Sequence, residues 1–84
     1  HDVRTHDMKP TLTLARMLPG GEVRRHTLPM TLKEARKAMY HVLVDNRACT
    51  ASEAQQASVK LEFVRGQFPE ITQCAGYSFW LEQN

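Results

Sequence analysis

The residues best placed to do chemistry are basic side chains that recur at helical spacing between residues 32 and 47. On a helical wheel they occupy one flank beside the apolar stripe, and no acidic side chain lies among them. The flank also holds a tyrosine, and its members are Lys33, Arg36, Lys37, Tyr40 and Arg47. Lysine and arginine attract phosphates whatever the base sequence, and a tyrosine can stack or form a hydrogen bond. This flank is therefore a candidate nucleic-acid-binding surface, although an ordinary solvated helix flank has the same composition.

Two further arginines, Arg24 and Arg25, precede this helix on a predicted strand. Successive residues of a strand point to opposite faces of its sheet. Only one of the two can therefore extend the basic flank directly, and the sequence does not say which.

The residues that most often serve in catalysis or metal binding do not form a recognisable set. Cys49 and Cys74 lack metal-ligand spacing and a CxxC pattern, so we expect both to be reduced thiols. His26 and His41 are isolated from other ligand types. The sequence contains no P-loop, no GxGxxG and no GxSxG motif. We expect no metal, no cofactor and no enzymatic activity.

Two capping boxes begin the helices that position these residues. In Thr31-Leu-Lys-Glu34 and in Thr50-Ala-Ser-Glu53, a threonine is followed three residues later by a glutamate. In such a pair, each side chain accepts a hydrogen bond from the other residue's free amide. Apolar residues then recur at helical spacing, which predicts helices at 32–46 and 51–67.

Alternating apolar and polar residues predict strands on both sides of the helices. Residues 11–18 and 22–28 flank Pro19-Gly20-Gly21, a strong turn signal, and residues 71–82 alternate again. Gly76, inside the last strand, indicates a bulge or a close approach of backbone. The predicted fold is α+β in the order β-β-α-α-β, with a three-stranded, mainly antiparallel sheet and two helices on one face.

Length and composition are typical of one globular domain. The chain has 84 residues, of which 42% are hydrophobic and 24% charged. We expect residues 8–84 to form that domain, and residues 1–7, before the first methionine, to be a disordered tail or a cloning remnant. The longest apolar stretch, 39–44, is far shorter than the roughly 20 residues of a membrane span, and no signal peptide is recognised. We therefore expect a cytoplasmic protein without membrane contact.

Apolar residues left over from the predicted core suggest a protein-binding surface. Val59 and Phe63 lie four residues apart on the outer side of the second predicted helix. They are either buried against the first helix or exposed to a partner. Trp80 is predicted to lie on the sheet face opposite Tyr77, where it is either a binding hot spot or covered by a loop. An exposed sheet edge could also pair with a partner strand or with a second copy, giving a homodimer.

Two segments resemble parts of winged-helix DNA-binding domains. Residues 48–57 look like the second helix of many helix-turn-helix domains. Residues 71–81, with Gly76-Tyr77, resemble the C-terminal hairpin of winged-helix domains of the response-regulator type. Those domains have three helices, whereas this sequence predicts two, so no recognition residue is transferred from the resemblance.

Two functions follow from these surfaces. The first is a small, non-enzymatic binding module, of the phage or plasmid type, that binds or inhibits an unidentified protein partner. The alternative is a small nucleic-acid-binding regulator that uses the basic flank of the first helix. In both, the protein acts by presenting a surface.

Overall fold

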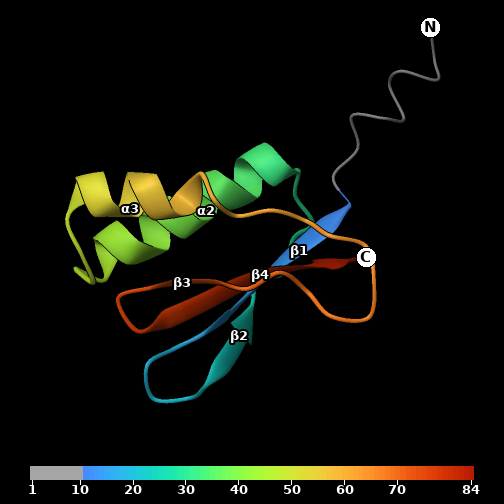
Figure 1. The fold of residues 1–84 in the computed structure, drawn as a ribbon, viewed down its shortest axis with the longest axis horizontal. Coiled ribbons are helices and arrows are strands. Elements are labelled where there is room, and N and C mark those ends of the chain that lie inside the picture. The colour runs from blue at the N-terminus through green and yellow to red at the C-terminus, as the bar shows by residue number, and fades with distance from the viewer. Residues whose placement is uncertain (1–10) are drawn as a thin grey trace, which may run out of the picture.

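A computed structural model describes residues 11–84 (Figure 1), so the tail predicted at residues 1–7 lies outside the described residues. The elements are β1 (Leu12–Met17), β2 (Val23–Arg25), α2 (Leu32–Asp45), α3 (Ala51–Ser58), β3 (Thr72–Cys74) and β4 (Tyr77–Gln83). The strands form one antiparallel sheet in the order β2-β1-β4-β3. The helices lie side by side on one face of this sheet. The α+β class with two helices is confirmed.

The prediction of a three-stranded sheet is wrong, because the last predicted strand is a hairpin. Cys74 pairs with Tyr77, and Ala75 and Gly76 form the two-residue turn between β3 and β4. Both turn residues have positive φ, 54° and 86°, as a tight hairpin turn of this kind requires. The turn reverses the chain, so Cys74 lies on the same face as Tyr77. If residues 71–82 formed one continuous strand, as the sequence predicts, Cys74 would lie on the face opposite Tyr77.

Both capping boxes are formed. The Thr31 hydroxyl accepts a hydrogen bond from the Glu34 amide at 3.2 Å, and the Glu34 carboxylate accepts one from the Thr31 amide at 2.9 Å. The pair at Thr50 and Glu53 repeats this geometry. These local contacts explain why both helices begin where the sequence predicts.

The predicted end of the second helix is wrong: α3 ends at Ser58, not at residue 67. The Ser58 hydroxyl donates to the Gln55 carbonyl at 3.1 Å, a local bond that competes with helical hydrogen bonding. The β-branched Val59 follows, and β-branched residues favour a helix less. The chain then leaves the helix and buries Leu61 completely in the core. Burial of this side chain outweighs the helical pattern that the later residues share.

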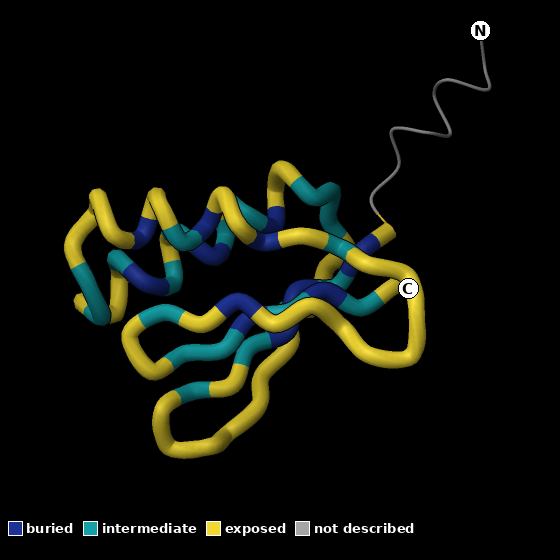
Figure 2. The backbone as a smooth tube through the Cα atoms, viewed as in Figure 1, coloured by how far each residue is buried: buried dark blue, intermediate teal, exposed yellow. Residues whose placement is uncertain are grey.

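The core lies between the helices and the sheet, where the buried parts of both face each other (Figure 2). The sheet contributes alternate residues of its two central strands, and α2 contributes one apolar stripe. The largest fully buried side chains are Leu14, Met39, Leu43, Leu61 and Phe79.

Arg47 occupies an unusual position just after α2. The Arg47 amide donates to the Val44 carbonyl at 3.0 Å, and the Ala48 amide donates to the Leu43 carbonyl at 2.9 Å. This is the Schellman pattern, which places one residue in the left-handed region, usually a glycine. Here that residue is Arg47, with φ of 55°.

Replacing this arginine by glycine removes backbone strain. We expect Arg47→Gly to raise the free energy of unfolding by about 1 kcal/mol, because glycine adopts a positive φ without steric cost. Urea denaturation measures the change. Asn46→Gly is the matched control: Asn46 has φ of −90° and donates to the Val42 carbonyl, so this change should destabilise. If Arg47→Gly is no more stable than the wild-type protein, the backbone at this position is not strained.

The β3–β4 turn predicts opposite effects at two adjacent positions. Gly76→Ala should lower the free energy of unfolding by about 1–2 kcal/mol, because an L-residue is strained at this φ. Its new Cβ would also lie 3.3 Å from Pro19 Cγ. Ala75→Gly should relieve strain and leave stability unchanged or higher. Thermal unfolding of the two variants checks this order, and a neutral Gly76→Ala would contradict it.

Candidate binding surface between the helices

A groove of about 290 Å³ lies between α2 and α3. It brings together members of both predicted surfaces, the basic flank of α2 and the apolar residue at the end of α3. Its lining residues are Arg36, Lys37, Tyr40, His41, Gln55, Ser58 and Val59.

Arg36 links α2, on one side of the groove, to the chain that follows α3. Its Nε donates to the Leu61 carbonyl at 2.9 Å, and its Nη2 lies 2.7 Å from the Glu62 carboxylate. Because α3 ends at Ser58, the Leu61 carbonyl has no helical amide to accept from and needs a donor from another element. Arg36 supplies one, so much of its hydrogen-bonding capacity is used within the protein.

The rest of the groove combines an apolar floor with a basic rim. The half-buried Tyr40 packs against the core, and Val59 is 54% exposed. The ring of His41 meets that of Tyr40 edge-on, with centroids 5.3 Å apart. Lys37 is exposed at the rim, and Lys33 is exposed one turn earlier on α2. This arrangement can hold an apolar side chain next to negative charge.

Three residues of the groove were not predicted: His41, Gln55 and Ser58. A signal existed for α3, because Gln55, Ser58 and Val59 are spaced i, i+3 and i+4 and so share one face of a helix. The sequence could not show that this face meets the basic flank of α2.

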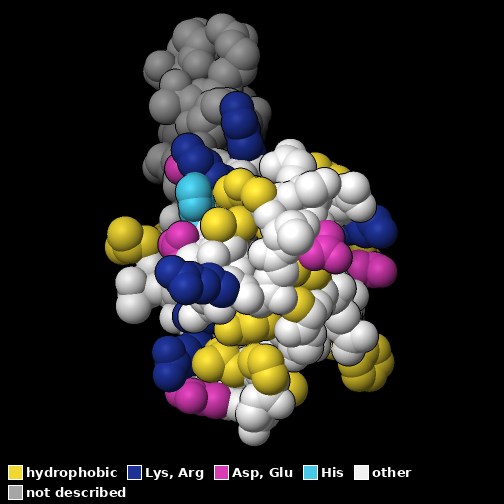
Figure 3. All heavy atoms as spheres, turned by 90° about the vertical axis from the view of Figure 1, so that its left-hand side faces the viewer, with side chains coloured by type: hydrophobic (Ala, Val, Ile, Leu, Met, Phe, Trp, Pro, Cys, Tyr) yellow, Lys and Arg dark blue, Asp and Glu magenta, His cyan; other side chains and the backbone are white. Residues whose placement is uncertain are grey.

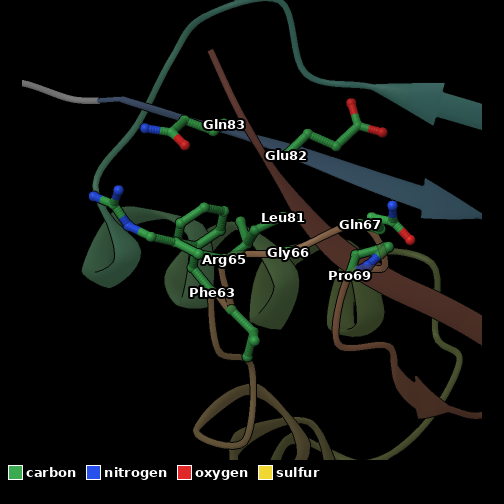
Figure 4. Close-up of a pocket in the computed structure, with 9 residues that line it drawn as sticks. Phe63, Arg65, Gly66, Gln67, Pro69, Leu81, Glu82 and Gln83 are labelled. Carbon is green, nitrogen blue, oxygen red and sulfur yellow. The ribbon is translucent and has the colours of Figure 1, made fainter.

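The predicted pairing of Val59 with Phe63 on one helix face is wrong, since α3 ends before either residue. Val59 lines the groove, whereas Phe63 lines a different pocket of about 440 Å³ (Figure 4). There Phe63 and Leu81 lie next to each other. Phe63 also packs against the core, so it is only partly available to a ligand.

The two arginines of β2 do not line the groove. Arg24 forms an ion pair with Glu22, and Arg25 forms a two-pronged ion pair with Glu82, with N–O distances of 2.9 and 3.0 Å. The hydrogen bond that each arginine donates to its carboxylate raises the pKa of that arginine. Both positive charges are thus balanced locally.

Arg47 also lies outside the groove, in the linker after α2, where it is exposed. Figure 3 views the end of the molecule that carries this linker and the hairpin tips. On that face, basic and acidic side chains are interspersed among hydrophobic ones.

Trp80 lies on the sheet face away from the helices. Its indole Nε1 donates to the Glu82 carboxylate at 3.1 Å, so Glu82 joins Trp80 to Arg25. Ala15 pairs with Trp80 on one side and with Arg25 on the other, and it is completely buried. Trp80 is therefore half-buried over a neighbouring strand.

The two edge strands of the sheet are β2 and β3, and each has three residues. Short edges offer few free backbone groups to another chain. A homodimer through a sheet edge stays a prediction.

Comparison with known proteins finds no matching family model, no similar curated protein and no similar solved structure. The hairpin implied by the winged-helix resemblance is present at residues 72–83, but residues 11–84 contain two helices. In this part of the chain, no helix has the length and apolar character needed to cross a membrane. Nor do three or more histidine, cysteine or acidic side chains gather there as potential metal ligands.

The Arg25–Glu82–Trp80 network predicts a pH dependence of stability. Hydrogen bonds from Arg25 and then Trp80 hold the pKa of Glu82 below its ordinary value of 4.5. A lowered carboxylate pKa stabilises the fold above the unfolded pKa, and this contribution is lost as pH falls through the folded pKa. We expect a contribution below about 1 kcal/mol, because the pair is partly exposed.

Trp80 is the only tryptophan, so its fluorescence reports this titration. In the folded protein, emission should change with a midpoint below pH 4.5, and Glu82→Gln should abolish the change. Glu82→Gln should be less stable than wild type at neutral pH, and the two proteins should become equally stable at low pH. A midpoint at or above the ordinary value would contradict the network.

Proposed function

We propose that this protein is a small, non-enzymatic binding module that takes an acidic segment of a partner protein into the α2–α3 groove. The observation that carries the proposal is that Tyr40 and Val59 line one groove with Lys37. The proposal places the protein in the cytoplasm, where thiols such as its two cysteines are kept reduced.

The chemistry of the groove suits a short peptide motif. Its volume of about 290 Å³ accommodates one or two side chains, not a large cofactor. An apolar anchor from the partner would lie against Tyr40 and Val59, and a tyrosine is a common source of binding energy at interfaces. Lys33 and Lys37 would attract carboxylates beside that anchor and speed association.

The charge arrangement favours a protein partner over nucleic acid. Of the seven residues predicted to bind nucleic acid, Arg24, Arg25 and Arg36 each pair with a carboxylate. A phosphate would have to compete with these carboxylates. A nucleic-acid-binding regulator therefore remains the second candidate, and it would depend mainly on Lys33, Lys37 and Arg47.

Peptide selection tests the proposal without a known partner. Random peptides displayed on phage are selected on the immobilised full chain, and enriched peptides are measured by fluorescence anisotropy. We expect enrichment of motifs that combine acidic residues with one apolar residue. Lys37→Glu and Val59→Asp should each weaken binding by about tenfold or more, because the first reverses the charge at the rim and the second removes the apolar contact with the anchor.

Matched variants outside the groove serve as controls. Lys60→Glu reverses an exposed charge, and Val64→Asp changes a valine that is 46% exposed in the other pocket. Both should leave peptide affinity unchanged. Loss of binding in Val64→Asp with no effect of Val59→Asp would move the site to that pocket and refute the groove.

Labelled DNA, duplex and single-stranded, tests the second candidate with the same variants. Binding that weakens steeply between about 50 and 200 mM salt, and that Lys37→Glu reduces, would indicate phosphate contacts. That result together with no selected peptide would replace the protein-binding proposal with the nucleic-acid one.

A further inference from the structure

The two cysteines, 25 positions apart in sequence, meet in the folded chain. Their sulfur atoms are 3.8 Å apart, and both residues are partly accessible. Cys49 belongs to the linker between α2 and α3, and Cys74 is the last residue of β3. The contact therefore joins the helical layer to the sheet.

Backbone structure on both sides fixes this contact. Cys49 follows the cap of α2, where the Ala48 amide donates to the Leu43 carbonyl, and precedes Thr50, whose amide donates to Glu53 at 3.0 Å. Cys74 is held by its pairing with Tyr77. A disulfide is about 2.05 Å long, so the sulfurs need to approach by less than about 2 Å. We expect side-chain rotation to supply this movement.

We propose that Cys49 and Cys74 form a reversible dithiol–disulfide site whose oxidant is a small-molecule disulfide such as glutathione disulfide. In the first step, the thiolate of one cysteine attacks a glutathione sulfur, forms a mixed disulfide and releases one glutathione thiolate. In the second, the other cysteine's thiolate attacks the protein-bound sulfur and releases the second glutathione. Two cysteine thiols are oxidised and glutathione disulfide is reduced to two glutathione molecules. The protons of the cysteine thiols are transferred to the two glutathione thiolates.

The thiol environment slows disulfide exchange at this site. Burial raises the pKa of the Cys49 thiol, and the adjacent Cys74 thiol raises it further. Fewer thiolates are then present near neutral pH, so exchange is slow relative to that of an ordinary thiol.

The disulfide would enclose α3 and residues 59–71, a segment without helix or strand. Closing such a loop restricts the unfolded chain, which stabilises the folded one. By thermodynamic linkage, the factor by which folding favours the disulfide equals the factor by which the disulfide favours folding. From the loop length, we expect this factor to be on the order of 100-fold. The inference does not depend on the proposed binding groove.

Equilibration of the full chain in glutathione redox buffers tests the site. Free thiols are blocked with N-ethylmaleimide, and intact mass distinguishes an internal disulfide from glutathione adducts. In native buffer we expect a monomer lacking two hydrogens. At a fixed glutathione concentration, it should form at a concentration of glutathione disulfide about 100-fold lower than in concentrated urea. The oxidised protein should also unfold at higher urea concentration than the reduced protein.

Single variants identify the atoms involved. Cys49→Ser and Cys74→Ser should each take up one glutathione and form no internal bond. Wild-type chains that carry two glutathiones, chains linked as dimers, or the same equilibrium in native buffer and urea would each overturn the proposal.

Discussion

The structure depends on the pairing of β1 with β4, which joins the first and last strands of the described chain at the centre of the sheet. Six residue pairs form this ladder, and one of them places Leu14 directly opposite Leu81 in the core. A hairpin joins β2 to β1, and another joins β3 to β4. The helices cover the face of the sheet that carries Leu14 and Leu81. Because the paired residues are so far apart in sequence, the core forms only when both ends of this part of the chain come together.

Tertiary contacts pair some of the basic side chains that the sequence alone shows as an unpaired basic surface. A helical wheel displays a continuous basic flank, but a wheel omits every neighbouring element. In the folded chain Arg36 lies beside Glu62, and Arg25 lies beside Glu82, a residue far along the sequence. The lysines of α2, which carry no such bond to another residue of 11–84, then provide the positive charge around the groove.

The α2–α3 hairpin underlies both proposals. Its groove is lined by the two helices, and its linker carries Cys49 toward Cys74. Two caps meet in this short linker, the Schellman pattern that ends α2 and the capping box that begins α3. The strained backbone of Arg47 lies between them. These local hydrogen bonds fix where α2 ends and where α3 begins, and packing against the sheet then decides the groove and the separation of the thiols.

The sequence by itself determined the features that depend on neighbours within a few residues. These are the starts of both helices at their capping boxes, the extent of the first helix, the β1–β2 hairpin and the α+β class. Only the tertiary structure decided the early end of α3, because burial of Leu61 competes there with helical periodicity. It also decided the fourth strand, since a two-residue turn at Ala75 and Gly76 leaves too little interruption in the pattern to separate two strands. The groove and the cysteine pair join residues from different elements, and such contacts follow from packing, which local patterns do not encode.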